Sequence, residues 1–136
     1  MRRARAERGL IDTSVVIELE SVDESQLPRE STISAVTLAE LAAGPHATDD
    51  AAERARRQER LQRTETTVDC LPVDAHVARA YGQVYVAVAS SGRKARGRRS
   101  FDLLIAATAL AHDLPLYTRN PDDFVGLKSL IDVVTV

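Results

Sequence analysis

Three carboxylates of this chain stand beside apolar stretches. Asp12 interrupts the run "LIDTSVVI", Glu40 lies in "SAVTLAEL", and Asp102 precedes the almost wholly apolar segment 103–111. A buried charge is costly unless a partner compensates it. Carboxylates that share a cleft raise each other's pKa unless a hard cation neutralises them. These residues therefore indicate a divalent-metal site, provided that the fold brings them together.

Each carboxylate also has a purely structural interpretation. Asp12 can cap the helix that follows it, and Asp102 can favour a helix N-terminus. Glu40 can close a capping box with Thr37, although Ser34 is the better cap for that helix. At this level the structural and the metal-binding interpretations both stay open.

Short apolar runs alternate with helical patterns along the chain. Strands are predicted at 10–11, 31–36, 68–73, 114–118 and 130–136, and helices at 13–19, 34–41, 49–65, 74–92, 100–114 and 120–124. This alternation predicts an α/β fold with a parallel sheet, whose ligands bind beyond the C-terminal ends of the strands.

That edge collects further polar residues. Asn120 follows the strand 114–118, with Asp122 and Asp123 just beyond it. The two aspartates also suit the first turn of a helix opened by "NPDDF". If the strands are parallel neighbours, these residues converge with Asp12 and Asp102.

The totals limit the class of protein. With 136 residues and 44% hydrophobic side chains, the chain suits one domain, 1–136, whose residues 1–8 form a basic extension. No window is apolar and long enough to span a bilayer, and the lone Cys70 excludes an intrachain disulfide. We therefore expect a cytoplasmic protein. Its net charge of −2 argues against a globally basic nucleic-acid binder.

A basic loop, residues 92–99, lies just before Asp102. It contains Arg93, Lys94, Arg96, Arg98 and Arg99. One interpretation is that this loop binds RNA phosphates, and the other is a solvated surface loop. A P-loop is excluded, because arginines occupy the positions of the required Lys and hydroxyl residue and no strand precedes it.

Other residues of chemical interest receive structural roles. Tyr81 and Tyr85 fit the apolar face of helix 74–92, and Cys70 fits a small core position. The three histidines, His46, His76 and His112, share no ligand spacing.

The segments "LIDTSVVIEL", "SAVTLAEL" and "FDLLIAATALAHDLPLYTRNPDDF" resemble the PIN-domain ribonucleases, specifically the VapC-type toxins of prokaryotic toxin–antitoxin pairs. The resemblance runs from Gly9 to Val136, with the motifs in the right order. It implies a three-layer α/β/α PIN-like domain with a central parallel sheet. It further implies a metal-dependent endoribonuclease site, a cognate VapB-type antitoxin as partner, and a homodimer.

The family's acids fall on Asp12, Glu40 and Asp102, and its fourth polar position falls on Asn120. Many relatives have aspartate at that fourth position, so Asp122 or Asp123 is a candidate for the missing charge. Auxiliary hydroxyls are expected from Thr13 and Thr118. Relatives often have Asn before the third acid, where this chain has Phe101, which affects a local contact.

The expected chemistry is hydrolysis of RNA by Mg²⁺ or Mn²⁺, with Asp12 and Asp102 as direct ligands. Glu40 either binds the metal through a water molecule or orients and deprotonates the attacking water, and Asn120 completes the site. A phosphoryl-aspartate enzyme is disfavoured, because Ser14 stands where that pattern needs a second aspartate. A receiver domain would need a paired acid beside Asp12, and none adjoins it. A module that binds RNA without cutting it would have no use for three acids.

Overall fold

The computed structural model describes residues 5–92 and 98–136, with Arg98 described in its backbone. The five strands are β1 (Arg8–Ile11), β2 (Glu30–Ser34), β3 (Asp69–Leu71), β4 (Leu116–Thr118) and β5 (Val133–Thr135). The helices are α1 (Thr13–Ile17), α2 (Ala35–Ala43), α3 (Ala51–Thr67), α4 (Ala75–Ser90) and α5 (Arg98–Ala111). Short 3-10 turns are η1 (Leu19–Ser21), η2 (Glu24–Gln26), η3 (Gly44–Ala47) and η4 (Pro121–Phe124).

The strands form one sheet in the order β3-β2-β1-β4-β5, and every neighbouring pair is parallel. The chain winds outward from β1 in both directions, so the order reverses on either side of this central strand. Open parallel sheets bind ligands at such a switch point, beyond the carboxyl ends of the strands. Asp12 follows β1 directly at this point.

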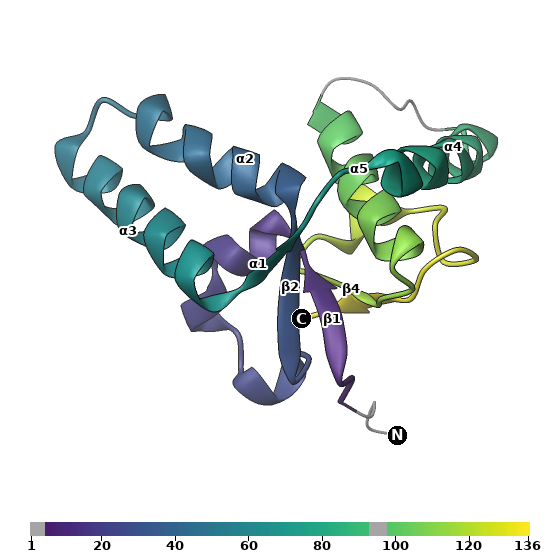
Figure 1. Cartoon of the computed structure of the whole chain (residues 1–136), viewed down its shortest axis with the longest axis horizontal. Helices are drawn as coiled ribbons and strands as arrows, with labels where there is room; N and C mark the ends of the chain where they lie inside the picture. The colour runs from purple at the N-terminus through teal and green to yellow at the C-terminus, as the bar shows by residue number, and fades with distance from the viewer. Residues whose placement is uncertain (1–4, 93–97) are drawn as a thin grey trace.

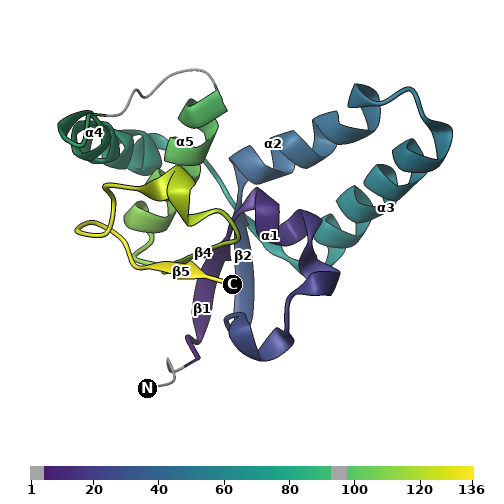
Figure 2. The ribbon, with the colours of Figure 1, turned by 180° about the vertical axis from the view of Figure 1, so that it is seen from behind.

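Helices cover both faces of the sheet (Figure 1). The first face packs α4 and α5 against Leu10 and Leu116, and the second packs α1 against Ile11 and Tyr117. Neighbouring residues of β1 and β4 thus enter opposite cores, as the alternation of side chains along a strand requires. Figure 2 shows the same three layers from behind, with α2 and α3 forming a hairpin at one flank. The predicted α/β/α architecture with a parallel sheet is confirmed.

Several predicted boundaries hold and others shift. Ser34 caps α2, because its hydroxyl accepts from the Val36 amide, and Gly44 follows the helix end. The capping box between Thr37 and Glu40 is therefore wrong. Helix α5 begins at Arg98, so Asp102 lies past the first turn rather than at the helix start.

Two assignments to the core are wrong. Cys70 is exposed, because β3 lies at the edge of the sheet. Tyr85 is 49% exposed, whereas Tyr81, four residues earlier, packs partly buried against the first core. The apolar face of α4 is thus narrower than its periodicity indicates, and it buries Val77, Ala80, Val84 and Val88.

Two interactions fix the elements that carry the site. The Ser34 and Thr108 hydroxyls lie 3.0 Å apart in the core and join β2 to α5. Gly9 lets β1 approach β4, since a Cβ at this position would lie 2.6 Å from Cε1 of Tyr117.

No helix within residues 5–92 and 98–136 is long and apolar enough to cross a membrane.

Candidate active site

A cleft of about 710 Å³ opens at the carboxyl edge of the sheet. It is lined by residues from β1–α1, α2, α3, α5 and the segment after β4. The polar residues predicted from the sequence that meet here are Asp12, Thr13, Glu40, Asp102, Asn120 and Asp123. We call Asp12, Glu40, Asp102 and Asp123 the acidic cluster. The expected convergence of widely separated carboxylates is therefore found in the structure.

Asp12 is the most constrained member of the cluster. It is 5% exposed and caps α1, with Oδ1 accepting from the Val15 amide at 3.1 Å and from the Ser14 hydroxyl at 2.6 Å. Its Oδ2 accepts from the Thr118 hydroxyl at 2.6 Å. Burial raises the pKa of Asp12, the three hydrogen bonds oppose that rise, and Asp123 adds to it. Capping and facing the cleft are thus compatible roles for one carboxylate.

Glu40 is held from the neighbouring helix. The Thr13 hydroxyl donates to Glu40 Oε1 at 2.8 Å and also lies 3.0 Å from the Thr37 hydroxyl. Thr13 follows Asp12 in the chain, so one short segment orients two acids of the cluster. Among the described residues, the other carboxylate oxygen of Glu40, Oε2, accepts no hydrogen bond, which leaves it available to a water molecule or an ion.

Asp102 carries the clearest electrostatic signature. Its pKa rises to about 6, mainly because it is partly buried, and further because of Asp123, Glu40 and Asp12. Arg99, one turn earlier on α5, opposes this rise. A carboxyl whose pKa is raised by other carboxylates is in a place where a cation would be favourable.

The segment after β4 completes this side of the cleft. The Thr118 hydroxyl accepts from the Asn120 amide at 2.9 Å while donating to Asp12, so it links both residues. Asn120 and Asp123 line the cleft, whereas Asp122 does not. Of the two candidates for the extra charge, Asp123 therefore has the appropriate position.

Most of the predicted basic loop lies outside the residues that the structure describes. Arg93, Lys94, Arg96 and the Arg98 side chain lie outside the described residues. Arg99 is described, and its guanidinium lies 3.4 Å from the carbonyl oxygen of Asp123. One cation of the predicted loop thus stands beside the acidic cluster.

Two further groups of residues at the cleft were not predicted from the sequence. Ser14 donates to Asp12 and accepts from the Arg119 amide at 3.1 Å, so it braces the first acid as Thr118 does. Its position two residues after Asp12 was the available signal. The second group is on α3, where Glu53, Arg57 and Arg60 line the cleft. The sequence pattern of a solvated helix does not show that α3 lines this cleft.

The acids line the same cleft, but their side chains are not arranged as a complete set of metal ligands. Among the residues that the structure describes, no three His, Cys, Asp or Glu side chains lie close enough to hold an ion together. The donor set nevertheless fits a hard cation: all candidates offer oxygen, and repulsion from the other carboxylates adds to the effect of burial in raising the pKa of Asp102. A bound divalent cation would offset this repulsion.

Fold and cleft define a class of protein: a three-layer domain with a parallel sheet and an acidic cluster at its carboxyl edge. Residues 9–128 match the family model of the PIN domain. The chain belongs to this PIN-domain family.

Individual relatives agree with this placement. The chain is 39% identical over 130 residues to ribonuclease VapC5 of Mycobacterium tuberculosis, covering 92% of this chain and 91% of that protein. The crystal structure of VapBC-5, a member of the VapBC family of toxin–antitoxin systems from the same organism, matches with a TM-score of 0.84 and 36% identity over 96% of this chain and 99% of the other. VapBC2 of Rickettsia felis shares the fold alone, with a TM-score of 0.72 and 20% identity over 95% and 97% of the two chains.

Proposed function

We propose that this protein is a divalent-metal-dependent endoribonuclease and the toxin of a toxin–antitoxin pair. The observation that carries the proposal is the acidic cluster at the switch point of the sheet, in a chain that is 39% identical to ribonuclease VapC5. The VapBC-5 match supports the toxin assignment, because that structure belongs to a toxin–antitoxin system.

The metal would be Mg²⁺ or Mn²⁺, since the available donors are carboxylate and amide oxygens. Asp12 and Asp102 would hold it, with Asn120 and Asp123 beside them. When bound, the ion supplies positive charge to the phosphate and lowers the pKa of water at the site. The same positive charge would return the pKa of Asp102 to the range of an ordinary carboxylate.

The chain's own residues orient the reactants. Ser14 and Thr118 fix both oxygens of Asp12, so this carboxylate needs no reorganisation when substrate arrives. Glu40, oriented by Thr13, takes the proton of the attacking water. The water oxygen bonds to phosphorus, the bond from phosphorus to O3′ breaks, and the departing O3′ takes a proton from solvent water. The fragments therefore carry a 5′-phosphate and a 3′-hydroxyl.

We further propose that a VapB-type antitoxin inhibits the enzyme by covering the cleft. An Arg or Lys side chain of the antitoxin would pair with the four carboxylates of the acidic cluster, and the antitoxin would order itself on binding. The active form would be a cytoplasmic homodimer of single-domain protomers.

The test is incubation of the purified protein with total RNA in Mg²⁺, in Mn²⁺ and in EDTA, followed by addition of the product of the adjacent upstream gene. Metal-dependent fragments that disappear on adding this gene product are expected. Intact RNA in both metals would contradict the nuclease proposal. If the product of the upstream gene neither binds the protein nor stops its cleavage of RNA, the inhibitor proposal alone would be contradicted.

A further inference from the structure

The active-site cleft has two walls of opposite charge. One wall is the acidic cluster at the carboxyl edge of the sheet. The other is α3, which presents two guanidiniums, Arg57 and Arg60, against one carboxylate, Glu53. The acidic wall alone would repel every phosphate of an RNA strand except one neutralised by metal. The α3 wall supplies the attraction that the rest of the strand needs.

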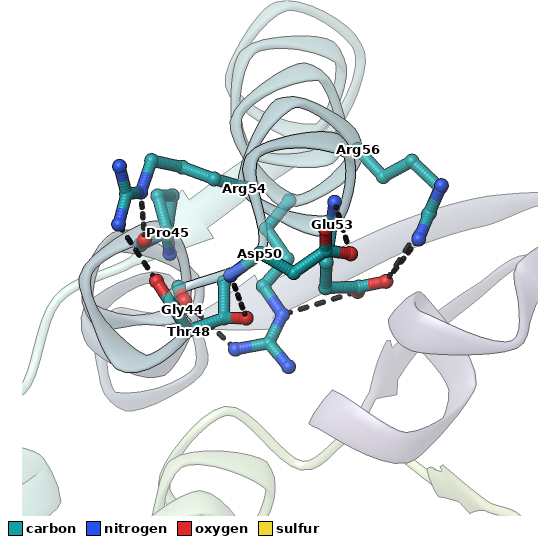
Figure 3. A network of polar contacts seen from close by, with 8 residues as sticks. Gly44, Pro45, Thr48, Asp50, Glu53, Arg54 and Arg56 are labelled. Carbon is teal, nitrogen blue, oxygen red and sulfur yellow. Dashed lines mark hydrogen bonds and ion pairs between the residues drawn. The ribbon is translucent and has the colours of Figure 1, made fainter.

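Arg57 is already held in position. Its Nε donates to Glu53 Oε1 at 3.1 Å, and its Nη1 donates to the Gly44 carbonyl at 2.9 Å. Glu53 also accepts from Arg56 at 2.7 Å, as Figure 3 shows, so its charge is shared between two arginines. The Arg57 guanidinium has five N–H groups in all, which leaves donors for an anion.

Arg60 is one helical turn further along α3. It lines both the active-site cleft and a neighbouring groove between η1 and α3. The other described arginines of α3 are paired, with Glu53, with Glu20 or with backbone carbonyls. Arg60 has no such hydrogen bond or ion pair among the described residues. It is half-buried and lines the cleft, and its planar guanidinium is the kind of group that binds phosphate through two parallel hydrogen bonds.

We propose that Arg60, with Arg57 beside it, is a positioning residue that binds a backbone phosphate next to the scissile one. This inference rests on the proposed ribonuclease function. A phosphate between the two guanidiniums would place the following phosphodiester over the acidic cluster. The strand would then cross from α3 to the carboxyl edge of the sheet, and single-stranded RNA is the substrate form that can bend into such a cleft.

The test replaces Arg60 by Gln, with Arg60→Lys to restore the charge. The control is Arg54→Gln, which removes the same charge from the same helix. Figure 3 shows Arg54 directed away from Arg56, toward Pro45 and Thr48, and its guanidinium bonds the carbonyls of those two residues. The probe is a fluorescein-labelled 12-nucleotide single-stranded RNA of mixed sequence. Binding is measured on the Asp102→Asn background, and cleavage is measured without that substitution.

Arg60→Gln should weaken binding about fivefold at 0.1 M salt and reduce the slope of log K against log salt by about 0.7, as expected for one lost contact to a single-strand phosphate. In cleavage assays KM should rise with kcat nearly unchanged, because the contact forms before the chemical step. Arg60→Lys should restore most of the affinity, and Arg54→Gln should match the parent.

Unchanged affinity, salt slope and KM for Arg60→Gln would overturn the inference while leaving the ribonuclease proposal intact, provided that the parent cuts RNA. Unchanged RNA binding together with weaker binding of the antitoxin would also overturn it and assign this wall to the protein partner. If the parent fails to cut any RNA in Mg²⁺ or Mn²⁺, the proposed function itself fails. The two failures are therefore distinguishable.

Discussion

The hydroxyl of Thr118 donates a 2.6 Å hydrogen bond to Oδ2 of Asp12, joining residues that stand 106 positions apart in the chain. The bond exists because β1 and β4 are parallel neighbours and both end at this edge. Thr118 is itself fully buried. The orientation of the first acid thus depends on a residue near the other end of the chain.

Replacing Thr118 by Val should destabilise the protein by about 1–3 kcal/mol, because the Asn120 amide loses its acceptor and Asp12 loses a donor. Loss of that donor should raise the pKa of Asp12 further, so the pH profile of cleavage should move to higher pH. Thr118→Ser, which keeps the hydroxyl, is the control. A pH profile of Thr118→Val identical to that of the parent would contradict the positioning role.

The raised pKa of Asp102 predicts how the stability of the metal-free protein depends on pH. Its pKa is about 6 in the folded protein, above the ordinary value of 3.8. The folded state therefore binds more protons than the unfolded state between these values, and stability falls as pH rises from about 4 to 6. Thermal melts in EDTA should show a lower Tm at pH 7.5 than at pH 5. Excess Mg²⁺ should remove much of the difference.

The substitution Asp102→Asn isolates that effect. The variant should melt higher than the parent in EDTA at pH 7.5, because one of several repelling carboxylates is gone. Asp12→Asn should instead melt lower, since an amide NH₂ facing the Thr118 hydroxyl leaves the hydroxyl hydrogen without an acceptor. Equal shifts for the two variants would show that the acids do not differ in environment as described.

Glu40 is expected to act on water rather than to stabilise the fold. Glu40→Gln keeps an acceptor for Thr13 but removes the base, so kcat should fall about 10²–10⁴-fold with little change in Tm. Thr13→Val should give a smaller fall in kcat, because it frees the carboxylate without removing it. A Glu40→Gln variant with parental kcat would exclude Glu40 as the base.

The basic loop remains a prediction. Replacing Arg93, Lys94, Arg96, Arg98 and Arg99 by Gln should weaken RNA binding and flatten its salt dependence, with metal affinity barely changed. Arg99→Gln alone should raise the pKa of Asp102, since Arg99 is the cation that opposes its rise. An unaltered salt slope would return the loop to a solvated surface role.

The sequence predicted the helix ends that depend on neighbouring residues and the common edge at which parallel strands end. Ser34 before a helical stretch and Gly44 after it define α2, because capping acts within one turn. The convergence of Asp12 and Asp102 followed from a general property of parallel sheets. These features needed no knowledge of how distant segments pack.

The remaining features depend on tertiary packing. Cys70 is exposed because β3 is an edge strand. The residues of β3 do not by themselves indicate whether the strand lies at the edge or in the middle of the sheet. Arg57 and Arg60 line the active-site cleft because the α2–α3 hairpin brings α3 beside it. The sequence of a mostly polar helix does not show which of its charged side chains line a cleft and which face solvent.

The most direct test of the account is the chemistry of the RNA ends. After cleavage in Mg²⁺ or Mn²⁺, the 5′ ends of the fragments should be ligatable without prior phosphorylation, because water rather than the RNA 2′-hydroxyl attacks phosphorus. EDTA should stop cleavage, and Asp12→Asn or Asp102→Asn should reduce it by orders of magnitude. Fragments with cyclic 2′,3′-phosphates, or full activity in EDTA, would contradict a metal-dependent hydrolytic site at the acidic cluster.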